Sequence, residues 1–167
     1  MTVAIRPLTA EEARTVAPEL AALGTRSKGA WDYDEGFMTR FGAQMATWLP
    51  EFVGGMRDDG GRVLLVAEDD GTTVGFAIVE QTDPAKPAWL EDLWIEPHRM
   101  RGGIGSQLLR AALEAARAAG RGALEFESDP NAEGFYLRMG ARKIGEQVSD
   151  FQAGRILPVM RFDLDGR

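Results

Sequence analysis

A glycine-rich segment near the middle of the chain has the composition of a phosphate-binding turn. It runs from Arg99 to Ser106 as Arg-Met-Arg-Gly-Gly-Ile-Gly-Ser. Glycine lets the backbone turn tightly and lets an anion come close to the amides. A helix that begins here would add unpaired N–H groups and the positive end of its dipole. The segment therefore suits a phosphate group, and Arg99 and Arg101 could add charge-assisted contacts.

Two well-known nucleotide motifs do not fit this segment. A P-loop requires Gly-Lys-Ser/Thr, whereas the sequence has Ile104-Gly105-Ser106 and no lysine. A dinucleotide fingerprint, Gly-x-Gly-x-x-Gly, would need a third glycine where Leu108 stands when counted from Gly103. A glycine-rich turn that binds no ligand remains the structural alternative.

Several carboxylates are candidates for proton transfer. Glu91 and Asp92 are adjacent in an expected strand, so side-chain alternation predicts that they point to opposite faces and that only one faces a cleft. Glu125 and Glu127 share one face of a later strand and are reserve candidates. For each of them the alternative is an ordinary surface or salt-bridged group.

The chain has no cysteine and a single histidine, His98. This excludes disulfides, thiolate metal sites and a cysteine nucleophile, and it leaves too few histidines for a histidine-rich metal site. We therefore expect no metal and a cytoplasmic location, where disulfides are rare. His98 directly precedes the glycine-rich segment, and we expect it to be a solvent-facing turn residue or a phosphate contact.

The charge balance excludes further classes of protein. Nineteen basic and 26 acidic residues give a net charge of −7, which argues against nucleic-acid binding. The excess of acid is compatible with a cationic ligand or simply with solubility. There is no apolar run of about 18 residues that would predict a membrane span. Residues 1–8 contain no apolar signal-peptide core.

Hydrophobic periodicity predicts one α/β (α+β) domain over residues 1–167, with a mixed central sheet of about seven strands flanked by about four helices. Strands are expected at 3–8, 62–68, 73–81, 88–95, 122–127, 142–148 and 156–164. Helices are expected at 10–23, 37–48, 103–119 and 131–139. Gly24 and Pro50 are expected to end the first two helices, which makes 24–33 a loop. The order is β-α-α-β-β-β-α-β-α-β-β, and the unit at 88–127 requires a right-handed parallel crossover.

Three blocks within residues 88–145 together resemble the GCN5-related N-acetyltransferase (GNAT) superfamily. Gly103 and Gly105 match the two small positions of its Gln/Arg-x-x-Gly-x-Gly/Ala loop, while Met100 departs from the first position. The preceding segment, Trp-Leu-Glu-Asp-Leu-Trp-Ile-Glu-Pro, resembles its splayed strand. Residues 128–141 resemble its Asn-x-x-Ala-x-x-Phe-Tyr-x-x-x-Gly-Phe/Ala segment.

The resemblance implies a GNAT-like fold that binds acetyl-CoA as cosubstrate. The loop would hold the CoA pyrophosphate, and the backbone of the splayed strand would pair with the pantetheine arm like an added strand. The cofactor-binding residues implied are Arg101, Gly102, Gly103, Ile104, Gly105 and Ser106 in the loop, Leu93, Trp94 and Ile95 in the strand, and Asn131 and Tyr136 in the third block.

The resemblance also implies the catalytic residues. Tyr136 would protonate the leaving CoA thiolate. Glu91 would face the acceptor and act as base, because the Leu-Glu-Asp run, followed by the aromatic Trp94 after one further residue, is similar to that of polyamine acetyltransferases. Trp31 and Tyr33, in the segment that covers the acceptor in this superfamily, would contact the substrate together with Glu91 and Glu127. Arg155 would border the same cleft.

The implied activity is acetyl transfer to a primary amine of a small molecule or a protein, by direct attack in a ternary complex. A non-catalytic acyl-CoA sensor and an enzyme for another acyl-CoA are the alternatives. The protein would have no nucleic-acid or membrane partner, and a homodimer is possible.

Overall fold

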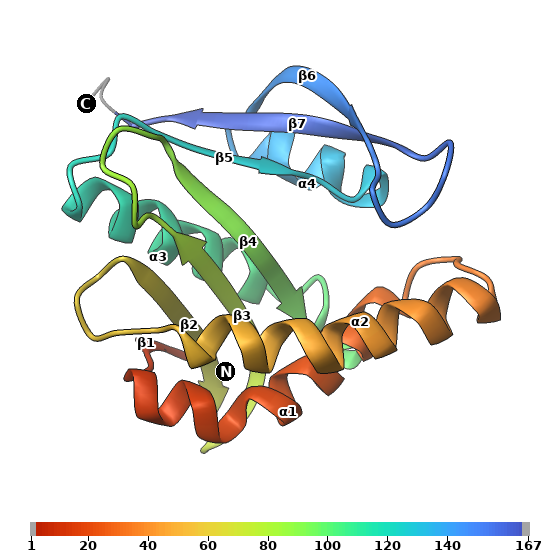
Figure 1. The fold of residues 1–167 in the computed structure, drawn as a ribbon, viewed down its shortest axis with the longest axis horizontal. Helices are drawn as coiled ribbons and strands as arrows, with labels where there is room; N and C mark the ends of the chain where they lie inside the picture. The colour runs from red at the N-terminus through yellow and green to blue at the C-terminus, as the bar shows by residue number, and fades with distance from the viewer. Residues whose placement is uncertain (1–2, 165–167) are drawn as a thin grey trace.

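Seven strands form a single mixed sheet in the order β1-β2-β3-β4-β5-β7-β6 (Figure 1). The computed structural model describes residues 3–164. The strands are β1 (Ala4–Pro7), β2 (Arg62–Asp69), β3 (Thr72–Glu80), β4 (Ala88–Ile95), β5 (Ala123–Glu127), β6 (Arg142–Val148) and β7 (Ile156–Asp163). The helices are α1 (Ala10–Lys28), α2 (Glu35–Gly54), α3 (Ile104–Ala118) and α4 (Glu133–Arg138), with short 3-10 turns η1 (Pro97–Arg99) and η2 (Pro130–Ala132).

The predicted order of elements and the mixed sheet are confirmed. β4 and β5 run parallel and are joined through α3, as the expected crossover requires, whereas the other neighbouring strands pair antiparallel. None of the helices within residues 3–164 is both long and apolar enough to cross a membrane.

The prediction that Gly24 ends the first helix is wrong, because α1 continues to Lys28. Gly24 packs closely against its neighbours: a Cβ there would lie 2.7 Å from Cε of Met45 and 3.3 Å from Cδ1 of Trp94. A helical glycine can thus mark a packing contact instead of a helix end. The predicted loop at 24–33 consequently begins only after Lys28.

The prediction that Pro50 ends the second helix is also wrong. α2 continues through Pro50 to Gly54. Leu49 and Val53, on either side of this position, are 0% and 1% exposed. Burying their side chains offsets the cost of a proline inside a helix, which loses one backbone hydrogen bond.

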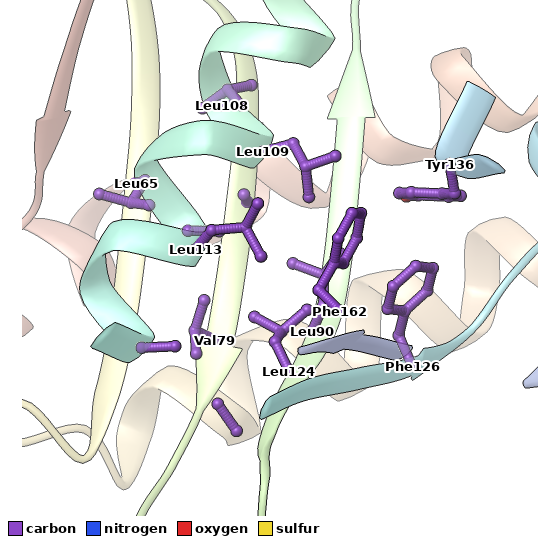
Figure 2. Close-up of a cluster of buried hydrophobic side chains, with 14 of the residues drawn as sticks. Leu65, Val79, Leu90, Leu108, Leu109, Leu113, Leu124, Phe126, Tyr136 and Phe162 are labelled. Atoms are coloured by element: carbon purple, nitrogen blue, oxygen red, sulfur yellow. The ribbon is translucent and has the colours of Figure 1, made fainter. Parts of the chain in front are cut away.

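Two hydrophobic cores lie on the two faces of the sheet. On one face Leu108, Leu109 and Leu113 of α3 point at the strands, where they meet Leu90 and Phe162 (Figure 2). On the other face, α1 and α2 cover Phe76 and Ile78 of β3. These two layers fix β3 and β4 in the centre of the sheet, and the central strands in turn position the site.

β4 departs from regular pairing along both of its edges. On one edge it pairs with β5 at Ala88–Leu124 and Trp89–Glu125, after which the two strands separate (Figure 1). On the other edge it carries a bulge, because Leu90 and Asp92 face consecutive residues of β3 and Glu91 is the extra residue between them.

The glycine at position 75 of β3 allows β4 and α3 to come close to this strand. A Cβ there would lie 3.0 Å from the backbone oxygen of Trp94 and 3.1 Å from Cδ1 of Leu108. We expect Gly75→Ala to lower the free energy of unfolding by about 1–3 kcal/mol, as overpacking does, measured by urea denaturation.

Gly54→Ala is the matched control, since no atom of the described residues lies within 4 Å of its Cβ position at the end of α2. It should be neutral or raise stability by up to about 1 kcal/mol. Equal stability of Gly75→Ala and the wild type would contradict the packing argument.

Candidate active site

A cavity of about 800 Å³ opens where β4 and β5 separate. Its lining comes from the end of α1, from β4, from the turn before α3, from the end of β5 and from α4. Segments distant in the sequence therefore meet around one space, and the residues predicted from the sequence can be placed relative to it.

The turn before α3 presents backbone N–H groups to this cavity. Gly103 caps the helix with φ of 86°, a left-handed conformation that favours glycine. The first N–H bonded within α3 is that of Gln107, which donates to the Gly103 oxygen. The amides of Ile104, Gly105 and Ser106 therefore have no partner inside the helix and, with its dipole, form an anion site.

The side chains of this turn divide between the core and the cavity. Ile104 is 2% exposed and belongs to the core, so only its backbone can bind a ligand. Arg101 lines the cavity, as does Arg138 of α4, which the sequence analysis did not single out. Arg99, proposed as a phosphate contact, donates instead to Asp69 at 2.9 Å.

The edge of β4 that faces the gap carries the backbone groups predicted for the pantetheine arm. The Glu96 N–H points to β3 and donates to the Val74 oxygen at 2.9 Å. By alternation the Ile95 N–H points to the gap, where it donates to Oγ of Ser27 at 3.2 Å. Leu93, two residues earlier, shares this orientation.

Trp94 has the opposite orientation. Its backbone faces Phe76 of β3, while its ring lies 5.7 Å from that of Phe41 on the α2 side. It also lines the cavity, so its side chain is the part available to a ligand.

The prediction that Glu91 and Asp92 point to opposite faces is wrong. Asp92 pairs with Ile78, whose side chain lies on the face covered by α1 and α2. Glu91 lies close enough to Arg62 and Glu80 on that face for their charges to shift its pKa. The bulge interrupts the alternation and turns both carboxylates toward the same side.

Both of these carboxyl groups line the cavity, and their pKa values are raised. Burial raises the pKa of Asp92 to about 8, with a further contribution from the charge of Glu91. Its Oδ2 is buried without a hydrogen-bond partner among residues 3–164. Burial also raises the pKa of Glu91, with Glu80 adding to the effect. An unpaired carboxylate with a pKa near neutrality is suited to accept a proton.

The two reserve carboxylates on β5 differ. Glu127 lines the cavity, and its pKa is raised by burial and by the charge of Asp150. Glu125 receives a hydrogen bond from Arg161 at 2.6 Å, so it is engaged in an ion pair.

Tyr136 lies on α4 with its side chain turned into the cavity wall. It is 7% exposed, and its ring lies beside that of Phe126 (Figure 2), with a centroid distance of 4.4 Å. The ring centroid of Phe135 lies 5.1 Å away. Burial raises the pKa of its phenol, and the charges of Asp92 and Asp129 add to the effect. The phenol is therefore protonated at neutral pH and able to donate.

The predicted acceptor-covering residues have separate surroundings. Trp31 lines the cavity, and so does Asn131, which was predicted to bind the cofactor. Tyr33 donates to Oδ2 of Asp129 at 2.7 Å and accepts from Arg155 at 2.7 Å, which places the predicted Arg155 beside it. The exposed His98 lies in η1.

Sequence reasoning missed Ser27, Lys28 and Asp129. Lys28 is 5% exposed and its ammonium forms an ion pair with Asp129, while Ser27 contacts β4. These partners are far apart in the chain, and no local pattern in the sequence indicates their contact. The sequence offered only one hint, which was that Lys28 lies in a segment expected to be a loop and had been given no role.

Comparison with known families decides the family of this chain. The model of the acetyltransferase (GNAT) family matches residues 28–141, which include β4, the glycine turn and Tyr136. The chain belongs to the GNAT family. It is therefore an acyltransferase that depends on acetyl-CoA, and the resemblance noted in its sequence is confirmed.

Solved structures share the GNAT fold over nearly the whole chain. A GCN5-related N-acetyltransferase from Rhodopseudomonas palustris has a TM-score of 0.78 at 23% identity, over 98% of this chain and 97% of that one. The PaiA N-acetyltransferase from Thermoplasma acidophilum, in complex with coenzyme A, has a TM-score of 0.72 at 20% identity, over 98% of this chain and 99% of that one. An aminoglycoside 6′-N-acetyltransferase complexed with coenzyme A has a TM-score of 0.74 at 14% identity, over 98% of both chains. A search of curated proteins gave no match.

Gly105 provides a test of the turn. A Cβ at this position would meet Cζ of Phe135 at 3.5 Å and Cγ1 of Ile95 at 3.9 Å, which are ordinary contacts. We expect Gly105→Ala to fold with wild-type stability. Gly105→Glu should abolish CoA binding, because its longer charged side chain would enter the cavity and repel the diphosphate. Isothermal titration with CoA measures the affinity of both variants for the cofactor. Unchanged binding by Gly105→Glu would refute the assignment of the loop.

Proposed function

We propose that this GNAT enzyme transfers the acetyl group of acetyl-CoA to a primary amine by direct attack in a ternary complex. The observation that carries the proposal is the content of the cavity. One space is lined by an amide-bearing helix start, the open edge of β4, a buried phenol and two acidic residues with raised pKa values. The acceptor is a small molecule or a protein amino group.

The chain's residues fit an extended, diphosphate-bearing cosubstrate. The turn formed by Arg101, Gly102 and Gly103, with the first amides of α3 that follow it, would hold the pyrophosphate. Leu93 and Ile95 would offer backbone groups to the amide arm from β4, with Asn131 opposite on η2. The Ser27 hydroxyl already accepts from the Ile95 N–H, so a cofactor oxygen would share this amide with Ser27.

Acetyl-CoA supplies an activated thioester, and the chain must move two protons. An ammonium acceptor has to lose a proton before it can attack. Glu91 and Asp92 would take this proton, because both are half-buried, have raised pKa values and are turned to the face covered by α1 and α2. Tyr136 would give a proton to the leaving thiolate, because its phenol remains protonated at neutral pH.

The acceptor side of the cavity is acidic. Glu91 and Glu127 line it from β4 and β5, and burial raises the pKa of both carboxyl groups. A cation bound near them would favour their ionised forms. Trp31 would add an aromatic surface. We infer a cationic amine as acceptor.

A non-catalytic acyl-CoA sensor is the second candidate. It would need the turn and the β4 edge, but it would not need an unpaired buried carboxyl group. Oδ2 of Asp92 is buried without a hydrogen-bond partner among residues 3–164, and leaving this atom unpaired costs free energy. A role in proton transfer accounts for that cost.

Thiol release from acetyl-CoA tests the proposal. The panel should hold polyamines, aminoglycosides, amino acids and peptides, with mass spectrometry to identify the acetylated product. We expect release that depends on one class of amine. CoA binding without release for any amine would favour the sensor.

Replacing Tyr136 by Phe removes the proposed proton donor and keeps the ring that packs on Phe126. We expect kcat to fall about 100-fold or more, since general acid catalysis contributes about 10²–10⁴-fold. The Kd for CoA in calorimetry should remain near the wild-type value. Equal turnover by wild type and variant would exclude Tyr136 as the acid.

The pH dependence should identify the proton acceptor. Asp92 is protonated below its pKa of about 8 and ionised above it, so kcat/KM should rise with pH up to about 8. Asp92→Asn should abolish this rise of kcat/KM with pH, whereas Glu91→Gln should retain it. The reverse pattern would assign proton acceptance to Glu91.

A further inference from the structure

The gap between β4 and β5 is fixed by backbone pairing at one end. Ala88–Leu124 and Trp89–Glu125 hold the two strands together there, and beyond these pairs the strands separate (Figure 1). The gap divides the sheet into two halves, one of β1 to β4 and the other of β5, β7 and β6. At the open end, side chains must set the position of one half relative to the other. The proposed site spans this gap, so its geometry depends on what sets the width.

The last turn of α1 lies across the open end. Oγ of Ser27 accepts from the Ile95 N–H of β4 at 3.2 Å. The adjacent Lys28 forms an ion pair with Asp129, which follows β5. The two side chains are 2% and 5% exposed. Two consecutive residues thus connect the two separated strands.

The ammonium of Lys28 is held in an aromatic cage. It lies 4.8 Å from the ring centroid of Tyr33, 5.3 Å from that of Phe41 and 5.7 Å from those of Phe37 and Trp94. Burial lowers the pKa of Lys28, and the charge of Asp129 opposes this. Cation–π contacts and a buried ion pair have strict geometric requirements, so the cage fixes where Asp129 lies.

Asp129 connects this ion pair to the helix that carries Tyr136. Its Oδ2 also accepts from Tyr33 at 2.7 Å and from Arg155 at 3.3 Å. Its Oδ1 accepts from the backbone N–H of Asn131 at 2.8 Å, at the start of η2. α4 follows η2 directly, so a shift of Asp129 would shift Tyr136 relative to β4.

We propose that Ser27 and Lys28 form a strap that sets the width of the cofactor gap and thereby positions Tyr136 opposite β4. Both are positioning residues that act through Ile95 and Asp129. The functional meaning of the strap rests on the proposed activity, whereas its effect on the gap does not.

The gap can be measured because the chain has no cysteine. Glu114→Cys, on the exposed side of α3, and Gln147→Cys, on the exposed strand β6, would carry two spin labels, one on each half of the sheet. Pulsed electron-spin measurements then give the distribution of the distance between them. CoA affinity by calorimetry and kcat in the thiol-release assay complete the data.

Lys28→Met keeps the apolar stem in the cage and removes the charge. We expect a broader and longer distance distribution, weaker CoA binding and a fall in kcat of about 100-fold, the loss that a 1 Å misplacement can cause. The contact between the rings of Phe37 and Phe151, 5.0 Å apart, still links α2 to the β6–β7 loop, so the halves should loosen without separating.

Lys143→Met is the matched control, because it removes a lysine–carboxylate pair with Glu146 on the exposed surface. It should leave the distance distribution and CoA affinity unchanged. If Lys28→Met has the wild-type distribution and CoA affinity and only a lower Tm, the ion pair contributes stability alone and the strap is refuted.

Asp129→Asn provides the test if Lys28→Met does not fold. The amide keeps an oxygen for the Asn131 N–H and loses the charge that Lys28 requires. The same broadening would support the strap, and an unchanged distribution would refute it. Failure of the wild type to bind CoA would overturn the proposed function instead, since the distance comparison does not depend on activity.

Discussion

The separation of β4 and β5 is the constraint on which the rest of this structure depends. A strand in the middle of a sheet normally has all of its backbone groups paired, and leaving them unpaired costs free energy. Here pairing stops after two positions, and the open edge faces a cavity. Ser27 satisfies the Ile95 N–H from outside the sheet. The remaining edge is suited to a ligand with amide groups of its own.

The bulge at Glu91 determines the chemistry on the other side of the strand. Without it, alternation would place Glu91 and Asp92 on opposite faces; with it, both turn to the face covered by α1 and α2. Burial among apolar neighbours then raises the pKa of Asp92 to about 8. On the cavity wall, Tyr136 stays protonated for the same physical reason. Low solvent exposure thus raises the pKa of both groups, which are the proton acceptor and the proton donor of the proposed mechanism.

The sequence by itself determined the order of elements, the glycine turn and the helix of Tyr136, because each depends on local properties. Hydrophobic periodicity identifies strands and helices, and the left-handed φ of Gly103 requires a residue without a Cβ. Resemblance to the GNAT superfamily, on motifs within residues 88–145, supplied the fold and the cosubstrate. The family match over residues 28–141 confirms that identification.

The tertiary structure alone decided where the first two helices end, which face the carboxylates share and what crosses the open end of the gap. Gly24 and Pro50 are signals of helix ends, but packing against neighbouring elements overrides them. Lys28 and Asp129 are 101 residues apart, so nothing in their local sequence indicates that they form an ion pair. A bulge, a buried charge and a raised pKa all arise from contacts between distant segments, and these exist only after the chain has folded.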